Sequence, residues 1–355
     1  MEKCKMFKLT RSRKTTQILI IISLIVVTGL MLSNCQQHNT DTGTKFPTLI
    51  GSYLDQKPPG EEPVLFAPGI VSTAMYTRDL SITQDGKEIF FCVTAYGFNL
   101  IFHTRQKNGV WTEPRPAPFI RNPQYMYYEP CVTPDGKRLF FLSNMPKSPG
   151  ESENEDIWVV DRSDTGWGEP YNLGAPVNSE NSEFYPSVTR DGTIYFTRQE
   201  KGSRTGHIYR SRLVNGKYIE PEKLPEQVNC GTNRFNAYIQ PEEKYIIVPA
   251  MGRDDSYGGT DYYVVFHNQK DQWSDPINLG DKINTASGRE FSASLSPDGK
   301  YFFFMSTRLN PALGNNLTGT PIIKLAHFYG QPQNGNADIY WVKADFIEKL
   351  RPDGF

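Results

Sequence analysis

Five stretches of the chain share one pattern of apolar and polar positions. Apolar residues alternate with polar ones, a two-residue turn follows, and then comes a run of apolar and aromatic residues. The clearest copies are "VTPDGKRLFFLSN" at 132–144 and "LSPDGKYFFFMST" at 295–307. The Asp-Gly pair supplies the positive φ angles of a tight hairpin turn, and the flanking residues are strand formers. Each stretch therefore predicts a β-hairpin.

The turns recur at a nearly constant interval, which predicts a repeat architecture. They lie 50 to 56 residues apart, at Asp85-Gly86, Asp135-Gly136, Asp191-Gly192, the degraded Glu242-Glu243, and Asp298-Gly299. A third apolar segment follows every hairpin. In four copies a fourth segment comes next, for example "WSDPINLGDKINT" at 273–285. Four strands per repeat is the composition of a propeller blade.

The fourth segment does not follow the fifth hairpin, but a copy precedes the first. The chain ends soon after "DIYWVK" at 338–343, whereas "EEPVLFAPGIVST" at 61–73 resembles a fourth segment. A strand lent by one terminus closes such a ring and removes its last open edge. The predicted fold is an all-β, five-bladed β-propeller of four-stranded antiparallel blades, closed by an N-terminal strand near residues 64–66. A six-bladed alternative would need a blade within 309–337, which is too short and too rich in Gly, Asn and Pro.

Several phrases carry a resemblance to a known repeat family. "TPDGKRLFFLS", "GGTDYYVV", "WSDPINLGDKINT" and "SPDGKYFFFMS" resemble the TolB-type, WD40-like propeller repeats of bacterial envelope proteins. The resemblance covers about residues 61–345 and implies a fold rather than an activity, because the family includes scaffolds, binders and some enzymes. TolB itself has six blades and a separate N-terminal domain. Neither is evident here, so TolB's partners are not carried over.

The N-terminus has the pattern of a targeting segment. Basic residues precede an apolar run at 18–32, which is shorter than the roughly 20 residues of a membrane-spanning helix. The run ends in "LSNC" at 32–35, which resembles the lipobox of bacterial lipoproteins, although Asn34 departs from the usual Gly, Ala or Ser. The resemblance implies a lipoprotein signal peptide at 1–34 and a lipid anchor at Cys35. An uncleaved signal anchor is the alternative.

Residues 35–60 are polar and rich in Thr, Gln, Pro and Gly, which predicts a flexible tether before a propeller domain at 61–355. A short helical tail is expected at the C-terminal end of that domain. Gln36 after the cysteine favours the outer membrane under the best-known sorting rule. We therefore expect a lipid-anchored protein of the bacterial cell envelope, at the outer membrane and facing the periplasm or the surface.

Composition excludes some classes of partner. Lys and Arg number 38 against 39 Asp and Glu, so no electrostatic case exists for nucleic acid. Cys92, Cys131 and Cys230 show no paired metal-ligand spacing, and the histidines are scattered. We expect no metal, no cofactor and a monomeric protein.

Charged residues recur where first strands begin and where second strands end. In a propeller both positions belong to the face opposite the Asp-Gly turns, so we expect them at the mouth of the channel. The candidate ligand-binding residues are Arg78, Glu129, Glu183, Arg198, Arg234, Arg253, Glu290 and Arg308. Neighbouring aromatic residues are expected to line the same mouth, namely Tyr127, Tyr128, Phe184, Tyr185, Phe235 and Phe291. The alternative is that Glu and Arg of adjacent blades pair with one another.

The sequence therefore predicts a non-catalytic binding or scaffold module for an envelope protein or glycan. Arg and carboxylate groups beside aromatic rings suit a polar ligand. The alternative is a glycan-active enzyme, a glycoside hydrolase or lyase, that uses the charged mouth. The insertion at 309–337 contains the apolar segment "IIKLAHFYG", for which we expect a lid or a docking patch.

Overall fold

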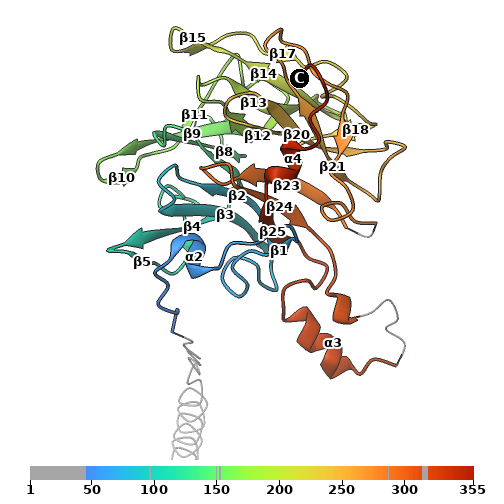
Figure 1. Ribbon diagram of the computed structural model, residues 1–355. Helices are drawn as coiled ribbons and strands as arrows, with labels where there is room; N and C mark the ends of the chain where they lie inside the picture. The colour runs from blue at the N-terminus through green and yellow to red at the C-terminus, as the bar shows by residue number, and fades with distance from the viewer. Residues whose placement is uncertain (1–44, 96, 149, 152, 287, 314–318) are drawn as a thin grey trace, which may run out of the picture. The chain divides into compact units, whose positions relative to one another are not determined.

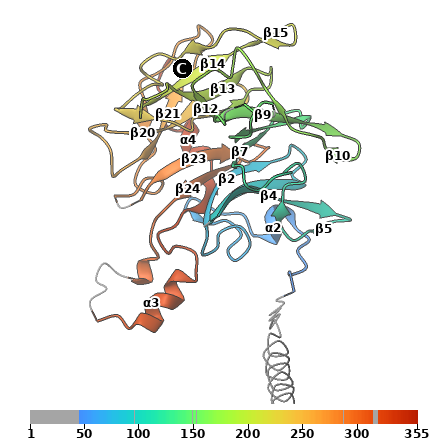
Figure 2. The same ribbon diagram turned by 180° about the vertical axis from the view of Figure 1, so that it is seen from behind.

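Five antiparallel sheets surround a central axis in the unit formed by Thr48–Phe355 (Figures 1 and 2). The structure is a computed structural model, and it describes residues 45–95, 97–148, 150–151, 153–286, 288–313 and 319–355. The predicted signal peptide and Cys35 lie outside the described residues. The sheets are the five blades of an antiparallel β-propeller, which confirms the predicted fold class.

The first strand of each blade lies at the axis and contacts the first strands of its neighbours. Blade 1 consists of β2 (Tyr76–Ile82), β3 (Glu88–Ala95), β4 (Phe98–Lys107), β5 (Val110–Trp111) and β6 (Arg115–Pro116). Blade 2 consists of β7 (Tyr127–Val132), β8 (Arg138–Ser143), β9 (Asp156–Ser163), β10 (Gly166–Trp167) and β11 (Tyr171–Asn172). Blade 3 consists of β12 (Ser182–Val188), β13 (Ile194–Gln199), β14 (Gly206–Ser211) and β17 (Glu222–Lys223).

A small hairpin of β15 (Leu213–Val214) and β16 (Lys217–Tyr218) lies between the last two strands of blade 3 in the chain. Blade 4 consists of β18 (Asn233–Arg234), β19 (Tyr238–Ile239), β20 (Tyr245–Met251), β21 (Asp261–Phe266) and β22 (Ile277–Asn278). Blade 5 consists of β23 (Glu290–Leu295), β24 (Tyr301–Ser306), β25 (Asp338–Lys343) and β1 (Val64–Leu65). A short helix, α4 (Asp345–Glu348), follows β25.

The N-terminal strand closes the ring as predicted. In β1, Val64 is opposite Trp341 of β25, and Leu65 is opposite Tyr340. The next residue, Phe66, is fully buried, and its ring centroid lies 5.3 Å from that of Trp341. Ser72 Oγ also donates to the backbone oxygen of Ile339 at 3.0 Å. The last blade is thus completed by residues from both ends of the propeller.

The repeated hairpin phrase has a local explanation in its turn. Gly136 has a φ of 70°, and the Asp135 carboxylate accepts hydrogen bonds from Thr133 Oγ1 at 2.6 Å and from the Lys137 amide at 3.0 Å. This Asx-type turn recurs in the other Asp-Gly copies. In the degraded copy Glu243 itself adopts a φ of 54°. The turn geometry is therefore kept in all five blades.

The first described residues of the predicted tether are packed against the propeller. Trp111 Nε1 donates to the Gly51 oxygen at 2.7 Å, and Gln56 Nε2 donates to the Leu65 oxygen at 2.8 Å. Leu54, in the short element α2 (Ser52–Asp55), is only 3% exposed. Apolar side chains and backbone hydrogen bonds hold this segment, so the packed unit begins before residue 61.

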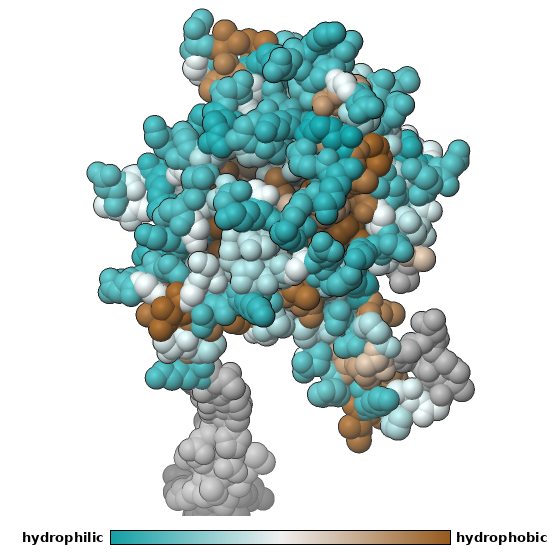
Figure 3. Space-filling model, viewed as in Figure 1, coloured by the Kyte–Doolittle hydropathy of each residue, from teal (hydrophilic) through white to brown (hydrophobic). Residues whose placement is uncertain are grey.

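The insertion between β24 and β25 contains no blade among its described residues. It holds a 3₁₀ turn at Pro311–Leu313 and the helix α3 (Ile322–Tyr329), which stands out from the sheets in both views (Figures 1 and 2). Hydrophobic side chains are exposed in this region (Figure 3), with Ile322 76% and Ile323 82% accessible. Across the described residues, no helix has the length and apolar character needed to cross a membrane.

Candidate functional site

A bulge interrupts the first strand of every blade at the same position. One residue there has a left-handed φ between 53° and 66°. These residues, which we call the bulge ring, are Asp79, Glu129, Tyr185, Asn236 and Ser292. The strand register shifts across the position in β2, β7, β12 and β23. A bulge turns a side chain out of the normal alternation, and left-handed backbone at non-glycine residues is often found at functional sites.

The bulge ring forms a buried polar plug across the axis. Arg78 Nη2 donates to Glu129 Oε1 at 2.6 Å, and the Tyr185 amide donates to Glu129 Oε2 at 2.7 Å. Asn236 Nδ2 lies 3.3 Å from Glu129 Oε1. The Asp79 carboxylate lies 2.7 Å from Arg78 Nε. Arg78 Nε and the Asp79 carboxylate therefore form an ion pair, although neither has a hydrogen-bond partner among the described residues.

Two carboxylates share one guanidinium in this plug. Burial raises the pKa of Glu129 to about 7; the Arg78 guanidinium opposes the rise, and the Asp79 carboxylate adds to it. Glu129 is 5% exposed and Asp79 is 3% exposed. A carboxyl group with a pKa near neutrality is partly protonated at physiological pH.

The residues just before the bulge ring form a second ring on one side of the plug. We call Arg78, Tyr128, Phe184, Phe235 and Phe291 the mouth ring, and they line a cavity of about 650 Å³. The Arg78 guanidinium carbon lies 5.2 Å from the Tyr128 ring centroid and 5.0 Å from that of Phe291. These cation–π contacts hold the arginine between two aromatic rings. Two methionines, Met126 and Met251, complete the apolar wall.

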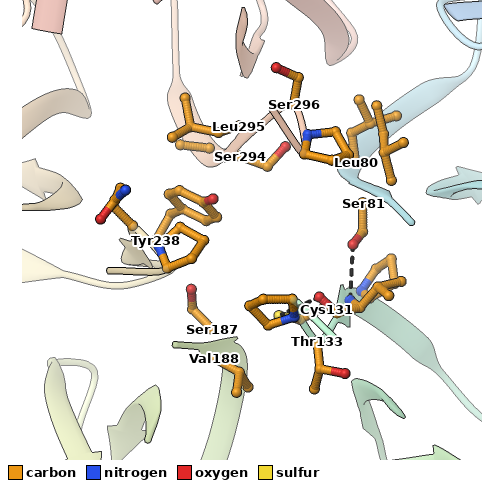
Figure 4. Close-up of a pocket in the computed structure, with 18 of the residues that line it drawn as sticks. Leu80, Ser81, Cys131, Thr133, Ser187, Val188, Tyr238, Ser294, Leu295 and Ser296 are labelled. Atoms are coloured by element: carbon orange, nitrogen blue, oxygen red, sulfur yellow. Dashed lines mark hydrogen bonds between the residues drawn. The ribbon is translucent and has the colours of Figure 1, made fainter. Parts of the chain in front are cut away.

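A smaller cavity of about 310 Å³ lies on the side of the Asp-Gly turns. Figure 4 shows Ser81, Cys131, Ser187, Tyr238 and Ser294 around it, one from each blade. The Ser81 hydroxyl accepts a hydrogen bond from the Val132 amide at 3.0 Å, which links neighbouring blades. Glu129 lines both cavities, so its carboxyl group separates the two sides of the axis.

Of the eight charged candidates, Arg78 and Glu129 meet at the axis. Glu183 and Glu290 are fully buried away from it. Arg198 Nε donates to Glu183 Oε1 at 2.7 Å, and Arg308 Nη2 donates to the Ile283 oxygen at 2.6 Å. Neither is a pairing of Glu and Arg from adjacent blades: Arg198 and Glu183 belong to the same blade, and Arg308 donates to a backbone oxygen. Arg78 and Glu129 do join adjacent blades, 1 and 2.

Strand alternation explains this outcome. Glu183, Arg234 and Glu290 each lie one residue before a member of the mouth ring, and successive side chains point to opposite faces of a sheet. Arg234 and Arg253 line a different cavity, next to the fourth strand of blade 3. The mouth ring therefore contains only one of the predicted charged residues, together with four of the predicted aromatic ones.

The bulge ring was only partly anticipated from the sequence. Asn236 and Ser292 were missed, although the aligned first strands have a polar residue at this position in every blade. The alignment of Asp, Glu, Tyr, Asn and Ser at this position is the sequence signal that could have predicted the bulge ring. The described residues of 309–337 are not among those lining the mouth cavity, so α3 does not cover it.

No family model matches the sequence, and no curated protein matches it. Solved structures similar to the chain include TolB from Acinetobacter baumannii, with 14% identity over 76% of this chain and 57% of that protein, at a TM-score of 0.42. A putative TolB from Agrobacterium tumefaciens has 14% identity over 65% of this chain and 70% of its own, at a TM-score of 0.43. The match thus spans less than two thirds of the Acinetobacter TolB.

An enzyme is among the similar structures as well. The α-L-arabinofuranosidase of Podospora anserina has 11% identity over 80% of this chain and 94% of its own, at a TM-score of 0.42. By its own five sheets the chain is a β-propeller, and its function has to be argued from its own residues.

Proposed function

We propose that this protein is an envelope-anchored, non-catalytic module that binds a partner protein at the mouth of its propeller. The mouth ring supports this proposal. It places four aromatic residues and one arginine around a cavity of about 650 Å³, beside two methionines. Aromatic residues, Met and Arg are the residue types enriched at protein interfaces, and they supply most of the strongest contacts.

The construction of the mouth also suits binding. Four members of the mouth ring lie in strands of the propeller and Phe235 directly follows β18, so little conformational entropy is lost when a partner docks. The bulge ring closes the floor with polar side chains that already contact one another. A partner segment would therefore stop above the plug instead of threading the axis.

The cellular setting belongs to the same proposal. Cys35 carries the lipid, residues 36–47 act as the tether, and the propeller is held as a monomer at the outer membrane. The tether is shorter than the sequence suggested, because residues 49–56 pack on the ring. A short tether limits how far the propeller reaches from the membrane and restricts which partners it meets.

Site-specific photo-crosslinking tests this function. A photoreactive phenylalanine at Phe184 or Phe235 in the full chain should capture the same protein in cells. The same group at Val214, which is 46% exposed on the outer hairpin, should not. With the captured protein purified, Phe235→Ala should weaken its binding about tenfold or more, as loss of a central aromatic contact does. Equal affinity of Phe235→Ala and Val214→Ala would refute the proposal.

One observation favours the enzymatic alternative. Glu129 has a pKa of about 7 and lies beside a second carboxylate, Asp79, at the axis. A protonated carboxyl group near neutral pH is the usual general acid of glycan hydrolysis. Release of sugar from envelope glycans that disappears in Glu129→Gln, with the fold intact, would replace the binding proposal by this one.

A further inference from the structure

Blades 3 and 5 share a buried carboxylate–arginine arrangement. Glu183 and Glu290 occupy equivalent positions, two residues before the bulge ring. Each accepts a hydrogen bond from a hydroxyl of the preceding segment, Ser179 Oγ at 2.6 Å or Thr285 Oγ1 at 2.8 Å.

An arginine accompanies each of these carboxylates and is stacked on a tyrosine of the third strand. Arg198 lies 5.0 Å from the Tyr209 ring centroid, and Arg308 lies 4.7 Å from that of Tyr340. Arg198 donates directly to Glu183. In blade 5 the Ser306 hydroxyl connects the two groups, since it lies 2.8 Å from Glu290 Oε1 and 3.0 Å from Arg308 Nε.

Blade 4 keeps the arginine and replaces the carboxylate. Arg253 is stacked on the equivalent tyrosine, with its guanidinium carbon 4.8 Å from the Tyr263 ring centroid. The position of Glu183 and Glu290 is taken by Arg234, and the position of Ser179 and Thr285 is taken by Cys230. A second cation thus stands where the other two blades have an anion, and the hydroxyl that served the anion is absent too.

Arg234 is a buried cation with no anionic partner among the described residues. It is 7% exposed, and its Nε donates to Asn229 Oδ1 at 3.3 Å. Among the described residues no carboxylate lies within 4.0 Å of its nitrogens. Burial lowers the pKa of Arg234. Burial also lowers the pKa of His207; the charges of Arg234 and Lys223 lower it further, and that of Glu200 opposes them.

Arg234 opens into a cavity of about 590 Å³ that is also lined by Arg253 and Lys223. Glu226 and Asp275 line it as well, but neither pairs with Arg234. Arg253 donates through Nε to Asp255 Oδ1 at 3.0 Å, so it is the rest of its guanidinium that could meet a ligand. The segments that carry the arginines lie side by side, because β18, which contains Arg234, pairs with β20 and the Thr232 amide donates to the Met251 oxygen at 2.8 Å. Gly231 permits this approach, since a Cβ there would lie 2.2 Å from that oxygen. The cationic wall is therefore preformed.

We propose that this cavity binds the carboxylate group of a small organic acid or acidic sugar, between Arg234 and Arg253. The ligand carboxylate supplies the negative charge that the Glu side chain supplies in blades 3 and 5. Arginine guanidinium groups are suited to carboxylates through paired, charge-assisted hydrogen bonds. This site is separate from the mouth ring, and it does not depend on the partner proposed there.

Calorimetric titration of the full chain tests the site. Acetate and glucuronate are the probes, with chloride at equal ionic strength as the reference. Binding of both identifies recognition of the carboxylate alone, whereas stronger binding of glucuronate identifies an acidic sugar. Arg234→Gln should weaken binding about 10- to 100-fold, the effect of losing hydrogen bonds to a charged group. Arg190→Gln, at an exposed arginine, should bind as the unmodified protein does.

The variant Arg234→Glu makes the decisive comparison, because it rebuilds the carboxylate–arginine pair of blades 3 and 5. It should fold with a melting temperature at or above that of the unmodified protein and should no longer bind either probe. Two results would overturn the proposal: no binding by the unmodified protein in the millimolar range, or equal binding by Arg234→Glu. Because Arg234→Glu retains the ring, failure here leaves the crosslinking result at the mouth unaffected.

Discussion

Replacing Glu290 by glutamine should change the free energy of unfolding in a pH-dependent way. The difference between the variant and the unmodified protein should be more favourable to the variant at neutral and alkaline pH than at acidic pH. Glu290 is fully buried, and its Oε1 accepts hydrogen bonds from Thr285 and Ser306 at 2.8 Å each. Its Oε2 has no hydrogen-bond partner among the described residues. Burial raises the pKa of this carboxyl group from 4.5 to about 7. The ionised form is therefore disfavoured in the folded state.

The sign follows from proton linkage. Between pH 4.5 and 7 the folded protein keeps the Glu290 proton while the unfolded chain has lost it. The free energy of unfolding therefore falls as the pH rises through this window. The contribution is full below pH 4.5, and about 3 kcal/mol is lost by pH 7, since each pH unit of difference corresponds to about 1.4 kcal/mol.

Urea unfolding of the full chain at pH 4.5, 6 and 8 measures this effect. Glu129 and Asp338 also have pKa values raised to about 7, so the raw pH dependence contains several groups. At each pH the free energy of unfolding of the unmodified protein is subtracted from that of Glu290→Gln. This difference isolates the Glu290 contribution and should grow by about 3 kcal/mol between pH 4.5 and 8. Glu180→Gln, at an exposed position, is the control and should show a constant difference. A difference for Glu290→Gln that is equally constant would refute the reasoning.

Three further predictions concern the closure of the ring, the Glu88 carboxylate and the polar plug. Phe66→Ala should lower the free energy of unfolding by about 3–5 kcal/mol, because a fully buried aromatic ring at the seam is lost, whereas Val110→Ala at an exposed position should cost little; urea unfolding compares them. Burial disfavours the Glu88 carboxylate, but hydrogen bonds from its His, Arg and Trp partners lower its pKa to about 2, so its stabilisation is complete above pH 4.5 and lost as the pH falls toward 2. Glu88→Gln should therefore lower the free energy of unfolding at pH 6 and leave it nearly unchanged at pH 2. An equal decrease at both pH values, measured by urea unfolding, would contradict this role of the Glu88 carboxylate. Asp79→Asn should lower the pKa of Glu129 from about 7, because the neighbouring charge that raises it is gone; carboxyl carbon NMR titration measures this, and an unchanged pKa would count against the shared-guanidinium description.

The blades and their closure could be predicted because their signals are local and repeated. An Asp-Gly pair such as Asp135-Gly136 fixes its own turn, and five copies at one interval leave few architectures. The missing fourth strand of the last repeat then pointed directly to residues 64–65. These inferences needed no knowledge of which blades touch.

The site was harder to predict because it depends on one extra residue in each first strand. Strict alternation would have put Glu129 on the same face as Tyr127 and away from Tyr128. The bulge turns Glu129 into the axis instead, whereas Glu183, before the bulge, follows the ordinary alternation and stays inside its blade. The packed segment at 49–56 could not be predicted for a different reason. Its partners, such as Trp111, are distant in the sequence, and no local pattern links them to this segment.

The seam between β1 and β25 joins the strand of the propeller that is synthesised first to the strand that is synthesised last. Ser72 and Ile339, which exchange hydrogen bonds there, are 267 positions apart in the chain. A nascent chain therefore carries β1 without its partner until β25 has been synthesised, and loop closure over such a distance is slow. During that interval the unmatched edges are the most vulnerable surface of the molecule to self-association, so any truncation of either end should show up first as aggregation instead of as a smaller stable ring.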